Sequence, residues 1–502
     1  MTVKYITLMG AMMALSLQTY AQFTADALRF SQVDQSSSAR FKGIGGAQTA
    51  VGGDISSLSG NPAGIGLFTR SEFSLTPELN SYSDKGTYFN TESVGQKDRL
   101  NLSQIGVVFR APTYRRAGQD TENGWLSVNF GIGFNRSHDL GNSFTFGGVN
   151  PYSSITDFFA DQANSSGLNP SDLVNDYNDY GDNAVAAGAY ENYLIGYDED
   201  EGSYYPEPDV NNMQRLTDNR KGSQNEFNFA VGANYSNKLY IGASLALTSL
   251  NYRSESVFTE SGYNPYQEND YRTNFTQIQD TKGSGVNGKL GIIYKAAPFL
   301  RIGASYQTPT WYTIDDDYSH EMSTQFGASR IDSQFFSPQE VYSSSYKVRT
   351  PSRINTGLVL LSKFGFISTD VEFVNYSGIN FTSATGDDLN EVRDDNNIVR
   401  DIYTNAINYR IGAEVKLDNI YARGGFGQLG NPYRDKENKN YQNTTISGGL
   451  GYRVNNYFLD LTYQNISYKT SYAPYTVVDE INPVAATKSN TSNVYLTFGV
   501  RF

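Results

Sequence analysis

Apolar and polar side chains alternate strictly at the end of the chain. Val494, Leu496, Phe498, Val500 and Phe502 occupy every second position. A period of two is that of a β-strand, because successive side chains point to opposite faces. We therefore expect residues 491–502 to form a strand with one face in an apolar medium and the other in a polar one.

The same alternation recurs upstream. Leu459 and Leu461 alternate with Asp460, and Ile407 and Tyr409 flank Asn408 in the same way. Such strands are typical of membrane barrels, in which one face meets lipid and the other a polar lumen. An Arg or Lys on the lipid face would cost about 2–4 kcal/mol at mid-bilayer. The charged phase is therefore assigned to the lumen, and it includes Arg353, Arg410, Arg423, Arg453 and Asp460.

The pattern predicts an all-β fold, a 14-stranded antiparallel transmembrane β-barrel. The expected strands are 72–80, 101–110, 124–135, 226–236, 238–252, 285–295, 299–309, 348–361, 364–376, 405–417, 419–428, 443–453, 456–468 and 491–502. Connections after even-numbered strands are short: 111–123, 237, 296–298, 362–363, 418 and 454–455. Those after odd-numbered strands are long: 81–100, 136–225, 253–284, 310–347, 377–404, 429–442 and 469–490. Short periplasmic turns alternating with long extracellular loops are typical of outer-membrane barrels.

The long loops are rich in Asn, Asp, Ser and Tyr. The largest, 136–225, contains the acidic run 198–201, and another contains 315–317. These runs lack the ligand spacing and the central Gly of a known calcium loop. A solvated, charge-rich outer surface is the favoured interpretation, and no metal or cofactor is predicted.

The first residues indicate export. Lys4 precedes an apolar stretch over 6–17, and Thr19 and Ala21 are small residues at −3 and −1 of a cleavage site. Residues 1–21 are therefore predicted to be a cleaved signal peptide, since the apolar stretch is shorter than the roughly 20 residues of a membrane-spanning helix. The chain contains no cysteine, which excludes disulfides and a lipid-modified N-terminus.

Composition fits this picture. The chain has 47 Gly and 38 Tyr in 502 residues, with a mean hydropathy of −0.48. High Gly and Tyr with low mean hydropathy suit a membrane barrel, because only alternate residues face lipid. A secreted, soluble all-β protein would have a similar composition. The formal net charge of −13 argues against nucleic-acid binding, which needs a basic face.

Residues 22–71 lack the alternation. They contain clustered turn residues, notably Gly43–Gly46, Gly52-Gly53 and the run Asn61-Pro62-Ala63-Gly64. About fifty residues with few large apolar side chains cannot easily bury a core of their own. A fourteen-stranded lumen is wider than its own side chains can fill. The segment is therefore expected to be a hatch inside the barrel, with the barrel itself formed by 72–502.

The segment from Asp54 to Ile65, with its Asn61-Pro62-Ala63 motif, resembles the N-terminal hatch of the FadL/TodX outer-membrane transporters of long-chain fatty acids and hydrocarbons. Further matches follow in the order of that family. They are the runs 301–309, 350–351 with 370–373, 409–414 with 423–425, and 449–453 with 459–463. The resemblance is scattered over nearly the whole mature chain. The ninety-residue second outer loop and the acidic loop surface depart from it, so substrate identity does not carry over.

The resemblance implies passive uptake of a hydrophobic small molecule. The molecule would be captured among outer loops, would pass to a site near the hatch and would leave sideways through a gap at a kink in the third strand. Here Gly131 and Gly133 are the candidate bend, or they make room for the hatch. Asn61 and Pro62 would pin and stiffen the hatch, or they simply form a turn that ends it. Phe502 resembles the C-terminal signal read by the barrel-assembly machinery.

Other functions remain as alternatives. A hydrolase would need a base beside its nucleophile, but the chain has only His138 and His320, and neither lies in a catalytic motif. We therefore expect no enzyme. The lumen charges would suit a general polar porin, and the large loops an adhesin or surface antigen. The expected partners are a hydrophobic ligand, outer-membrane lipid with lipopolysaccharide, and the assembly machinery, but not nucleic acid.

Overall fold

The computed structural model describes residues 25–34, 37–114, 120, 122–178, 183–327, 333–383, 389–435, 441–478 and 481–502. The predicted signal peptide, 1–21, lies outside the described residues. None of the helices in these ranges has the length and apolar character needed to cross a membrane.

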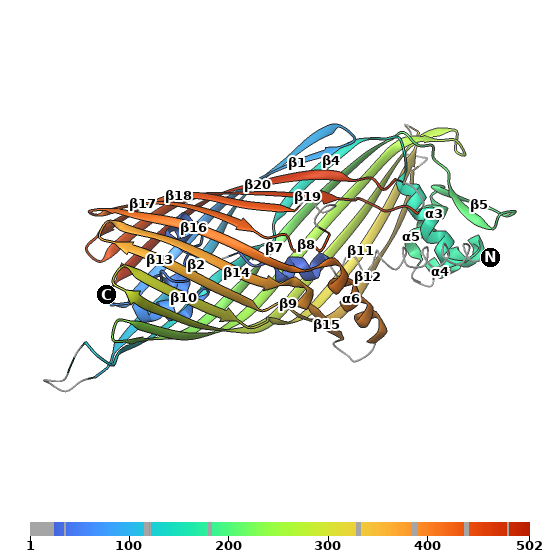
Figure 1. The fold of residues 1–502 in the computed structure, drawn as a ribbon. Coiled ribbons are helices and arrows are strands. Elements are labelled where there is room, and N and C mark those ends of the chain that lie inside the picture. Colours follow the sequence, from blue (N-terminus) through green and yellow to red (C-terminus); the bar gives the residue numbers. More distant parts are fainter. Residues whose placement is uncertain are drawn as a thin grey trace.

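Fourteen antiparallel strands close a barrel (Figure 1), which confirms the predicted fold class. Strand β1 pairs with β2 on one side and with β20 on the other, from Glu72↔Arg501 to Thr87↔Ala486, so the sheet has no open edge there. In wall order the strands are β1 (Glu72–Tyr88), β2 (Thr91–Pro112), β3 (Trp125–Asp139), β7 (Asn212–Tyr235), β8 (Leu239–Asn264), β9 (Asn269–Ala297), β10 (Leu300–Gln307), β13 (Arg353–Ser362), β14 (Gly365–Asn375), β16 (Asn405–Leu417), β17 (Ile420–Leu429), β18 (Gln442–Val454), β19 (Tyr457–Tyr472) and β20 (Ala485–Arg501).

The predicted alternation of faces is present. In β19, Leu459 and Leu461 are 46% and 50% exposed, whereas Asp460 between them is 1% exposed. A closed wall that is apolar outside and polar inside satisfies every ladder hydrogen bond while presenting lipid with hydrocarbon. The chain is therefore an outer-membrane barrel.

The turns at one end of the barrel are short, as expected. Strands β7 and β8 are joined through Ser236 and Asn237, both with positive φ, and β18 and β19 through Asn455 and Asn456. Pro77 lies within β1, where the register with β2 shifts between Thr76 and Pro77. Such a bulge accommodates proline, which has no N–H to donate to the ladder.

The outer half of the barrel corrects three predicted loops. Residues 81–100 form a continuous hairpin of β1 and β2 with a tight turn at Phe89 and Asn90, both at positive φ. Most of 253–284 belongs to β8 and β9, and 310–347 contains β11 (Trp311–Phe326) and β12 (Ser333–Arg349). These outer parts of the strands lie beyond the section of the wall whose outer face is apolar, which we call the apolar belt. They carry polar residues on both faces, so the alternation of apolar and polar residues from which strands were predicted is absent there.

Four wall positions are built from two successive strands, and one of them is β3 followed by β4 (Asn142–Asn150), both of which pair with β7. β10 is followed by β11 after Pro309, and β12 by β13 after Pro351. β14 is followed by the 3₁₀ turn η4 (Tyr376–Gly378) and the short strand β15 (Asn380–Ser383). Proline removes a ladder donor and so favours the breaks at Pro309 and Pro351. The helix α6 (Leu389–Ile402) then leads to β16.

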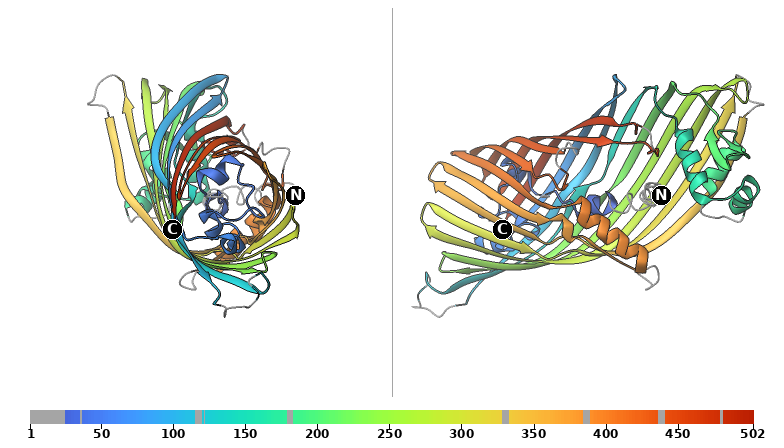
Figure 2. Two further views of the ribbon diagram at one scale, coloured as in Figure 1. Left: turned by 90° about the vertical axis from the view of Figure 1, so that its left-hand side faces the viewer. Right: turned by 45° about the vertical axis from the view of Figure 1, so that its right-hand side comes forward.

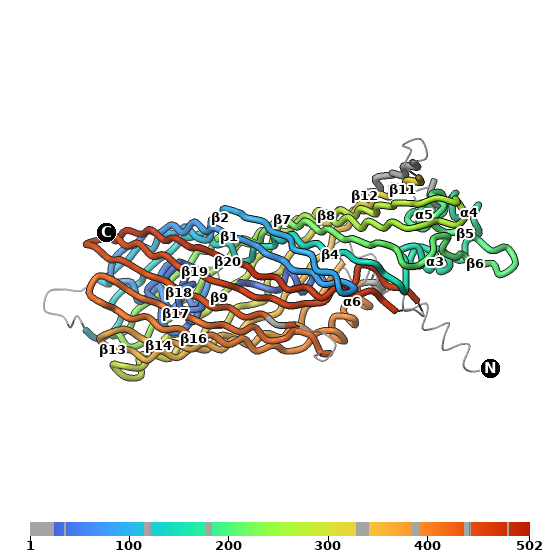
Figure 3. Tube along the Cα trace, turned by 90° about the horizontal axis from the view of Figure 1, so that it is seen from above, coloured from blue at the N-terminus to red at the C-terminus, as the bar shows by residue number. Residues whose placement is uncertain are grey.

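The predicted loop 136–225 is also wrong as a single loop. It contains the end of β3, the strand β4 (Asn142–Asn150), the helices α3 (Ile155–Ser166), α4 (Pro170–Asn178) and α5 (Ala184–Glu191), the hairpin of β5 (Ile195–Asp198) with β6 (Ser203–Pro206), and the start of β7. Figure 3 shows β7 and β8 running on toward these helices. Phe159 of α3 packs against Phe275 of β9, with ring centroids 5.5 Å apart, so the helices close over the outer end of the sheet.

The N-terminal segment, meaning the described residues between 25 and 71, lies inside the barrel (Figure 2). It contains a helix over 25–31, α2 (Ala39–Gly43), and the 3₁₀ turns η1 (Ile55–Leu58) and η2 (Pro62–Leu67). Phe41, Ile44, Ile55 and Ile65 have no exposed surface. These apolar side chains are buried against the wall rather than against each other alone, because Ile55 and Ile65 share a cluster with Val108 and Ala230 of the strands.

Candidate functional site in the barrel lumen

The N-terminal segment is attached to the wall by side chains of the polar inner face. Thr497 accepts a hydrogen bond from the backbone N–H of Ala39 at 2.7 Å, and the hydroxyl of Thr462 donates to the carbonyl of Ala39 at 2.6 Å. The carboxylate of Asp370 accepts from both the backbone N–H and the hydroxyl of Thr49, at 2.8 and 2.7 Å. These hydrogen bonds pair buried polar groups of the segment with buried polar groups of the wall.

Glycines of the inner face allow this close approach. A Cβ atom at Gly412 would overlap the backbone of Ile44, and one at Gly242 would overlap Pro62. Gly291 would collide in the same way with the side chain of Asn61. Lumen-facing positions of the strands are therefore glycine where the N-terminal segment touches the wall. This accounts for part of the high glycine content of the chain.

Asn61 occupies a junction within this contact. Its side-chain oxygen accepts from the N–H of Ala63 at 3.1 Å and so caps η2, with Pro62 at the first helical position. Its amide NH₂ donates to the carbonyl of Thr49 at 2.7 Å and to that of Ile292 in β9 at 3.3 Å. One side chain therefore joins two parts of the segment to the wall. Whether it gates the channel stays a prediction.

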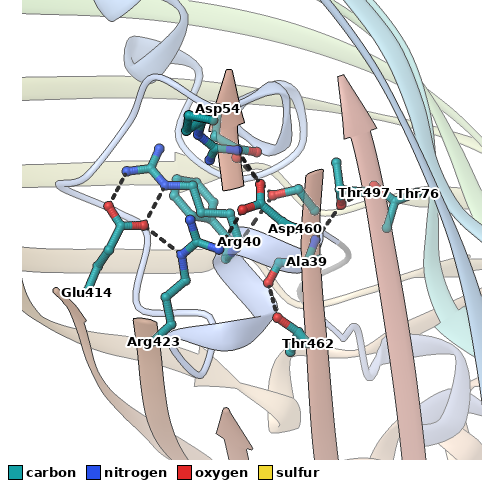
Figure 4. A network of polar contacts seen from close by, with 12 residues as sticks. Ala39, Arg40, Asp54, Thr76, Glu414, Arg423, Asp460, Thr462 and Thr497 are labelled. Atoms are coloured by element: carbon teal, nitrogen blue, oxygen red, sulfur yellow. Dashed lines mark hydrogen bonds and ion pairs between the residues drawn. The ribbon is translucent and has the colours of Figure 1, made fainter. Parts of the chain in front are cut away.

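The predicted lumen charges lie in two ion-pair networks. In the first, Arg423 bridges Glu414 at 2.7 Å and Asp460 at 2.7 Å. Arg40 of α2 pairs with Glu414 at 3.0 Å (Figure 4). Arg453 pairs with Asp460 at 2.9 Å. The N-terminal segment thereby contributes a cation to a network of the wall.

The second network is centred on Glu372 of β14. Arg353 and Arg410 pair with its two carboxylate oxygens at 3.1 and 2.8 Å. Arg353 also donates to the carbonyl of Ser31 in the N-terminal segment. Sequence periodicity identified the strand cations, but Arg40 was missed because the N-terminal segment has no periodic pattern.

Gly131 and Gly133 do not form the predicted bend. Gly131 pairs with Val108 of β2 and Ala230 of β7, and Gly133 is likewise paired on both sides without a register shift. A Cβ at either glycine would overlap Leu58 of η1. The two glycines make room for the N-terminal segment, which was the alternative interpretation.

Strand β3 is interrupted at a point further along the chain than Gly133. The ladder between β2 and β3 ends at Gln104↔Asn135, and a register shift against β7 follows between Arg136 and His138. β3 then gives way to β4 through Leu140 and Gly141, while both strands continue to pair with β7. Among the described residues, the stretch 91–103 of β2 pairs with β1 only.

Side chains span this interruption. Asp139 accepts hydrogen bonds from the hydroxyl of Tyr82 at 2.7 Å and from the amide of Asn101 at 3.0 Å. Arg99 of β2 donates to the carbonyl of Arg220 in β7 at 2.6 Å and lies 3.8 Å from Asp139. The wall is held here by side-chain contacts instead of a backbone ladder.

Two cavities of several hundred Å³ lie in the lumen. The inner cavity, of about 450 Å³, extends from Lys42 and Glu78 to the interruption at residues 139–142. The outer cavity, of about 490 Å³, lies against Ile155 and Phe158 of α3. Both are lined by Ala25, Arg29, Arg220 and Tyr472, so they meet at these residues.

At the outer end, Glu260 of β8 fixes helix α3. Its buried carboxylate accepts hydrogen bonds from the hydroxyl of Ser154 and the N–H of Ile155, at the start of α3, and from Gln214 and Tyr271. Burial raises the pKa of Glu260 above its ordinary value. An acceptor at a helix N-terminus satisfies N–H groups that have no partner within the helix.

The two histidines lie in different strands. His138 of β3 has its Nε2 4.0 Å from a carboxylate oxygen of Asp34, and His320 of β11 is buried beside the rings of Phe275 and Tyr342. Within the described ranges there is no group of three or more His, Cys, Asp or Glu residues that could hold a metal ion. The acidic run at 198–201 forms the β5–β6 turn, in which Asp198 accepts from the N–H groups of Asp200 and Glu201.

No family model matches the sequence, and none of the curated proteins does. Among solved structures, a FadL homologue of Pseudomonas aeruginosa is similar with a TM-score of 0.53 and 12% identity, over 93% of this chain and 99% of that one. The toluene transporter TodX of P. putida is similar with a TM-score of 0.51 and 13% identity, over 93% and 99% of the two chains. The chain therefore has the fold of the FadL/TodX-type outer-membrane transporters.

Proposed function

We propose that the chain is a channel for passive uptake of small molecules with a hydrophobic body, long-chain or aromatic. The substrate enters the outer cavity beside α3, moves past Arg29 and Tyr472 into the inner cavity, and leaves sideways between β2 and β3. The observation that carries the proposal is that the inner cavity ends at the interruption of strand 3.

The contacts at the interruption support lateral release. A side-chain hydrogen bond contributes about 0.5–1.5 kcal/mol net, whereas a backbone group left unpaired in lipid costs several kcal/mol. Separating Asp139 from Tyr82 and Asn101 therefore costs far less than opening a ladder elsewhere in the wall. On the outer face of β2, Leu100, the neighbour of Asn101, is 78% exposed, so an apolar side chain lies outside the exit.

Similarity of fold supports the hydrophobic class of substrate. The two similar structures are those of a FadL homologue and a toluene transporter. A general polar porin is disfavoured, because the N-terminal segment and two ion-pair networks fill the lumen between the cavities and the end with short turns.

A reversible cross-link tests the exit. The chain has no cysteine, so Asn101→Cys with Asp139→Cys can be joined specifically by a short bifunctional thiol reagent. Cells that express the joined protein should lose uptake of radiolabelled dodecanoate and toluene, and reductant should restore it. The matched control is Gln428→Cys with Thr444→Cys, a hydrogen-bonded pair in the continuous β17–β18 ladder. Full uptake with the first pair joined would refute lateral release.

A further inference from the structure

The β1–β2 hairpin overlaps β4 instead of pairing with it. Gly86 belongs to the buried, lumen-facing side of β1, and a Cβ atom there would overlap the backbone of Thr145 in β4. Gly95 of β2 pairs with Asp84, so it shares the face of Gly86, and it approaches Ser143 of β4 in the same way. Strand β4 therefore lies on the lumen side of the hairpin, and the two form an overlapping seam beside the exit.

This seam contains no backbone ladder in the part of the chain that the structure describes. Strand β4 pairs with β7 alone, and the stretch 91–102 of β2 pairs with β1 alone. Opening the wall elsewhere would break a ladder, which is costly in a membrane. The hairpin can therefore move away from β4 while its own backbone pairing stays intact.

A hinge for this movement lies at the base of the hairpin. The register between β1 and β2 shifts between Thr76 and Pro77, with Ser103 as the extra residue of β2, and the β1–β20 ladder lacks bridges at Thr76 and Pro77. A bulge bends its strand locally. This bulge lies beside Gln104, where the β2–β3 ladder ends. We call the part of the hairpin beyond it, residues 78–102, the flap.

The tip of the flap is fastened by Tyr88. Its ring packs against Phe146 of β4, with centroids 5.0 Å apart, and the residue is 1% exposed. Its hydroxyl donates to the side-chain oxygen of Gln214 in β7. The amide of Gln214 donates in turn to the carboxylate of Glu260 in β8 at 2.6 Å. The flap tip is thus connected through Gln214 to Glu260.

The same carboxylate holds the start of α3. Glu260 accepts hydrogen bonds from the hydroxyl of Ser154 and from the backbone N–H of Ile155, the latter at 3.1 Å. Ile155 and Phe158 line the outer cavity. A molecule that fills this cavity would contact α3, and the first residue of α3 is bonded to the carboxylate that also binds Gln214.

We propose that the flap closes the lateral exit and that the hydrogen bonds from Tyr88 through Gln214 to Glu260 latch it to α3. A substrate that displaces the start of α3 loosens this latch, and the flap then lifts from β4. Because a ligand shifts an equilibrium only through its different affinity for the two states, the substrate binds better once α3 has moved. The inference rests on the proposed function, since it concerns the control of the same exit, and it makes Tyr88 a positioning residue.

Spin labels report the position of the flap, because the chain has no cysteine of its own. One label is placed at Glu92→Cys, exposed in the flap, and the other at Glu255→Cys, exposed in β8. The full-length protein in lipid nanodiscs should give one distance. In Tyr88→Phe a second population should appear, longer by about 5 Å, one strand spacing. Toluene should raise the same population in the wild type.

The matched control for Tyr88→Phe is Tyr495→Phe. Tyr495 is 3% exposed, and its hydroxyl donates to Gln464 at 3.3 Å between β19 and β20, two strands with a continuous ladder. This variant loses a comparable buried hydrogen bond but no part of the latch. The distance between the labels should therefore stay that of the wild type.

The link to α3 is tested at Ser154, whose hydroxyl bonds to Glu260 and not to the flap. Ser154→Ala should produce the longer population as well, and combining it with Tyr88→Phe should add less than the two separate effects. The matched control is Ser166→Ala at the other end of α3, where the hydroxyl donates to the carbonyl of Ala163 within the helix. It should leave the distance unchanged.

Uptake shows whether the movement serves release. Tyr88→Phe should take up radiolabelled toluene about twofold to tenfold faster than the wild type, the factor that corresponds to one hydrogen bond. Misfolding cannot produce such a gain. Phe89→Cys with Tyr152→Cys replaces two rings 6.0 Å apart and lets the same thiol reagent fix the flap tip to the loop after β4. Joining this pair should abolish toluene uptake, also in Tyr88→Phe, and reductant should restore it.

Three results would overturn the inference. An unchanged distance in Tyr88→Phe or in toluene-treated wild type would show that the flap is not released as described. An effect of Tyr88→Phe without one of Ser154→Ala would exclude the link to α3. Full uptake with the tip joined would show that the flap need not move, and the proposed function would stand if joining Asn101→Cys to Asp139→Cys still blocked uptake. Uptake that survived both cross-links would refute the proposed function as well.

Discussion

Asn61 uses every polar atom of its amide. Its oxygen caps η2 and its nitrogen donates to two carbonyls, one of them in the wall. Neither a methyl group nor a carboxylate at position 61 could make all three hydrogen bonds. Substituting Asn61 by Ala or Asp therefore tests its role.

Asn61→Ala should lower the free energy of unfolding by about 1–3 kcal/mol, because the cap and two donations are lost. Asn61→Asp keeps the cap acceptor but turns a negative oxygen toward the carbonyls of Thr49 and Ile292, so it should be at least as destabilising. Urea unfolding in lipid bilayers measures both. If Asn61→Asp matched the wild type, the wall contact would be unimportant.

Arg423 is the centre of its network. Its side chain has no exposed surface and bridges Glu414 and Asp460, each of which keeps one other arginine partner. Removing it leaves two buried carboxylates only partly neutralised.

Arg423→Met should destabilise the protein by about 3 kcal/mol, at the lower end for breaking a buried pair. Arg453→Met should cost roughly 1 kcal/mol, because Arg453 is 18% exposed and Asp460 retains Arg423. The same urea titration compares the two. Equal effects would contradict a network centred on Arg423.

Strand β11 carries a buried histidine beyond the apolar belt. Burial lowers the pKa of His320 to about 4 from the usual 6.5. The folded state therefore favours the neutral ring, so its contribution to stability is present above pH 6.5 and is lost as the pH falls toward 4.

Amide hydrogen exchange in β11, corrected for intrinsic rates, should accelerate as the pH falls from 6.5 to 4. In His320→Phe this acceleration should be much smaller. The comparison is needed because the raised pKa of Glu260 acts in the opposite sense and adds stability as the pH falls. Identical pH profiles for the two proteins would rule out His320 as the cause.

Strand β3 contains two glycines, Gly131 and Gly133, which could mark either a bend or a close contact. Gly131 and Gly133 suggested a bend, yet both are fully paired, and the interruption begins after Asn135. Glycine in a strand marks either a bend or the close approach of another segment. The continuous pairing of both glycines and the position of Leu58 distinguish the two, and no local sequence pattern indicates either.

At the scale of the whole molecule, the lumen is closed toward the end with short turns. In planar bilayers the wild-type protein should show no large, steady open channel, because the N-terminal segment is bonded to several strands around the wall. A general polar porin would instead conduct steadily. A large constant conductance would therefore contradict the proposed uptake route.

The sequence by itself determined the fourteen strands, their order and the lumen phase of Arg353, Arg410, Arg423, Arg453 and Asp460. Lipid on one face and polar surroundings on the other require apolar and polar residues to alternate with a period of two, and this alternation is visible in the sequence of each strand. The outer ends of the strands show no such alternation, because polar residues occupy both faces beyond the membrane.

The tertiary structure alone decided which side chains meet. The pairing of Arg40 with Glu414 joins residues 374 positions apart, and the donations from Tyr82 and Asn101 to Asp139 replace a missing ladder. The inner cavity is lined by residues of α2, of eight different strands and of the helix over 25–31. Such contacts depend on closure of the barrel around an aperiodic segment, and hydropathy along the chain carries no information about them.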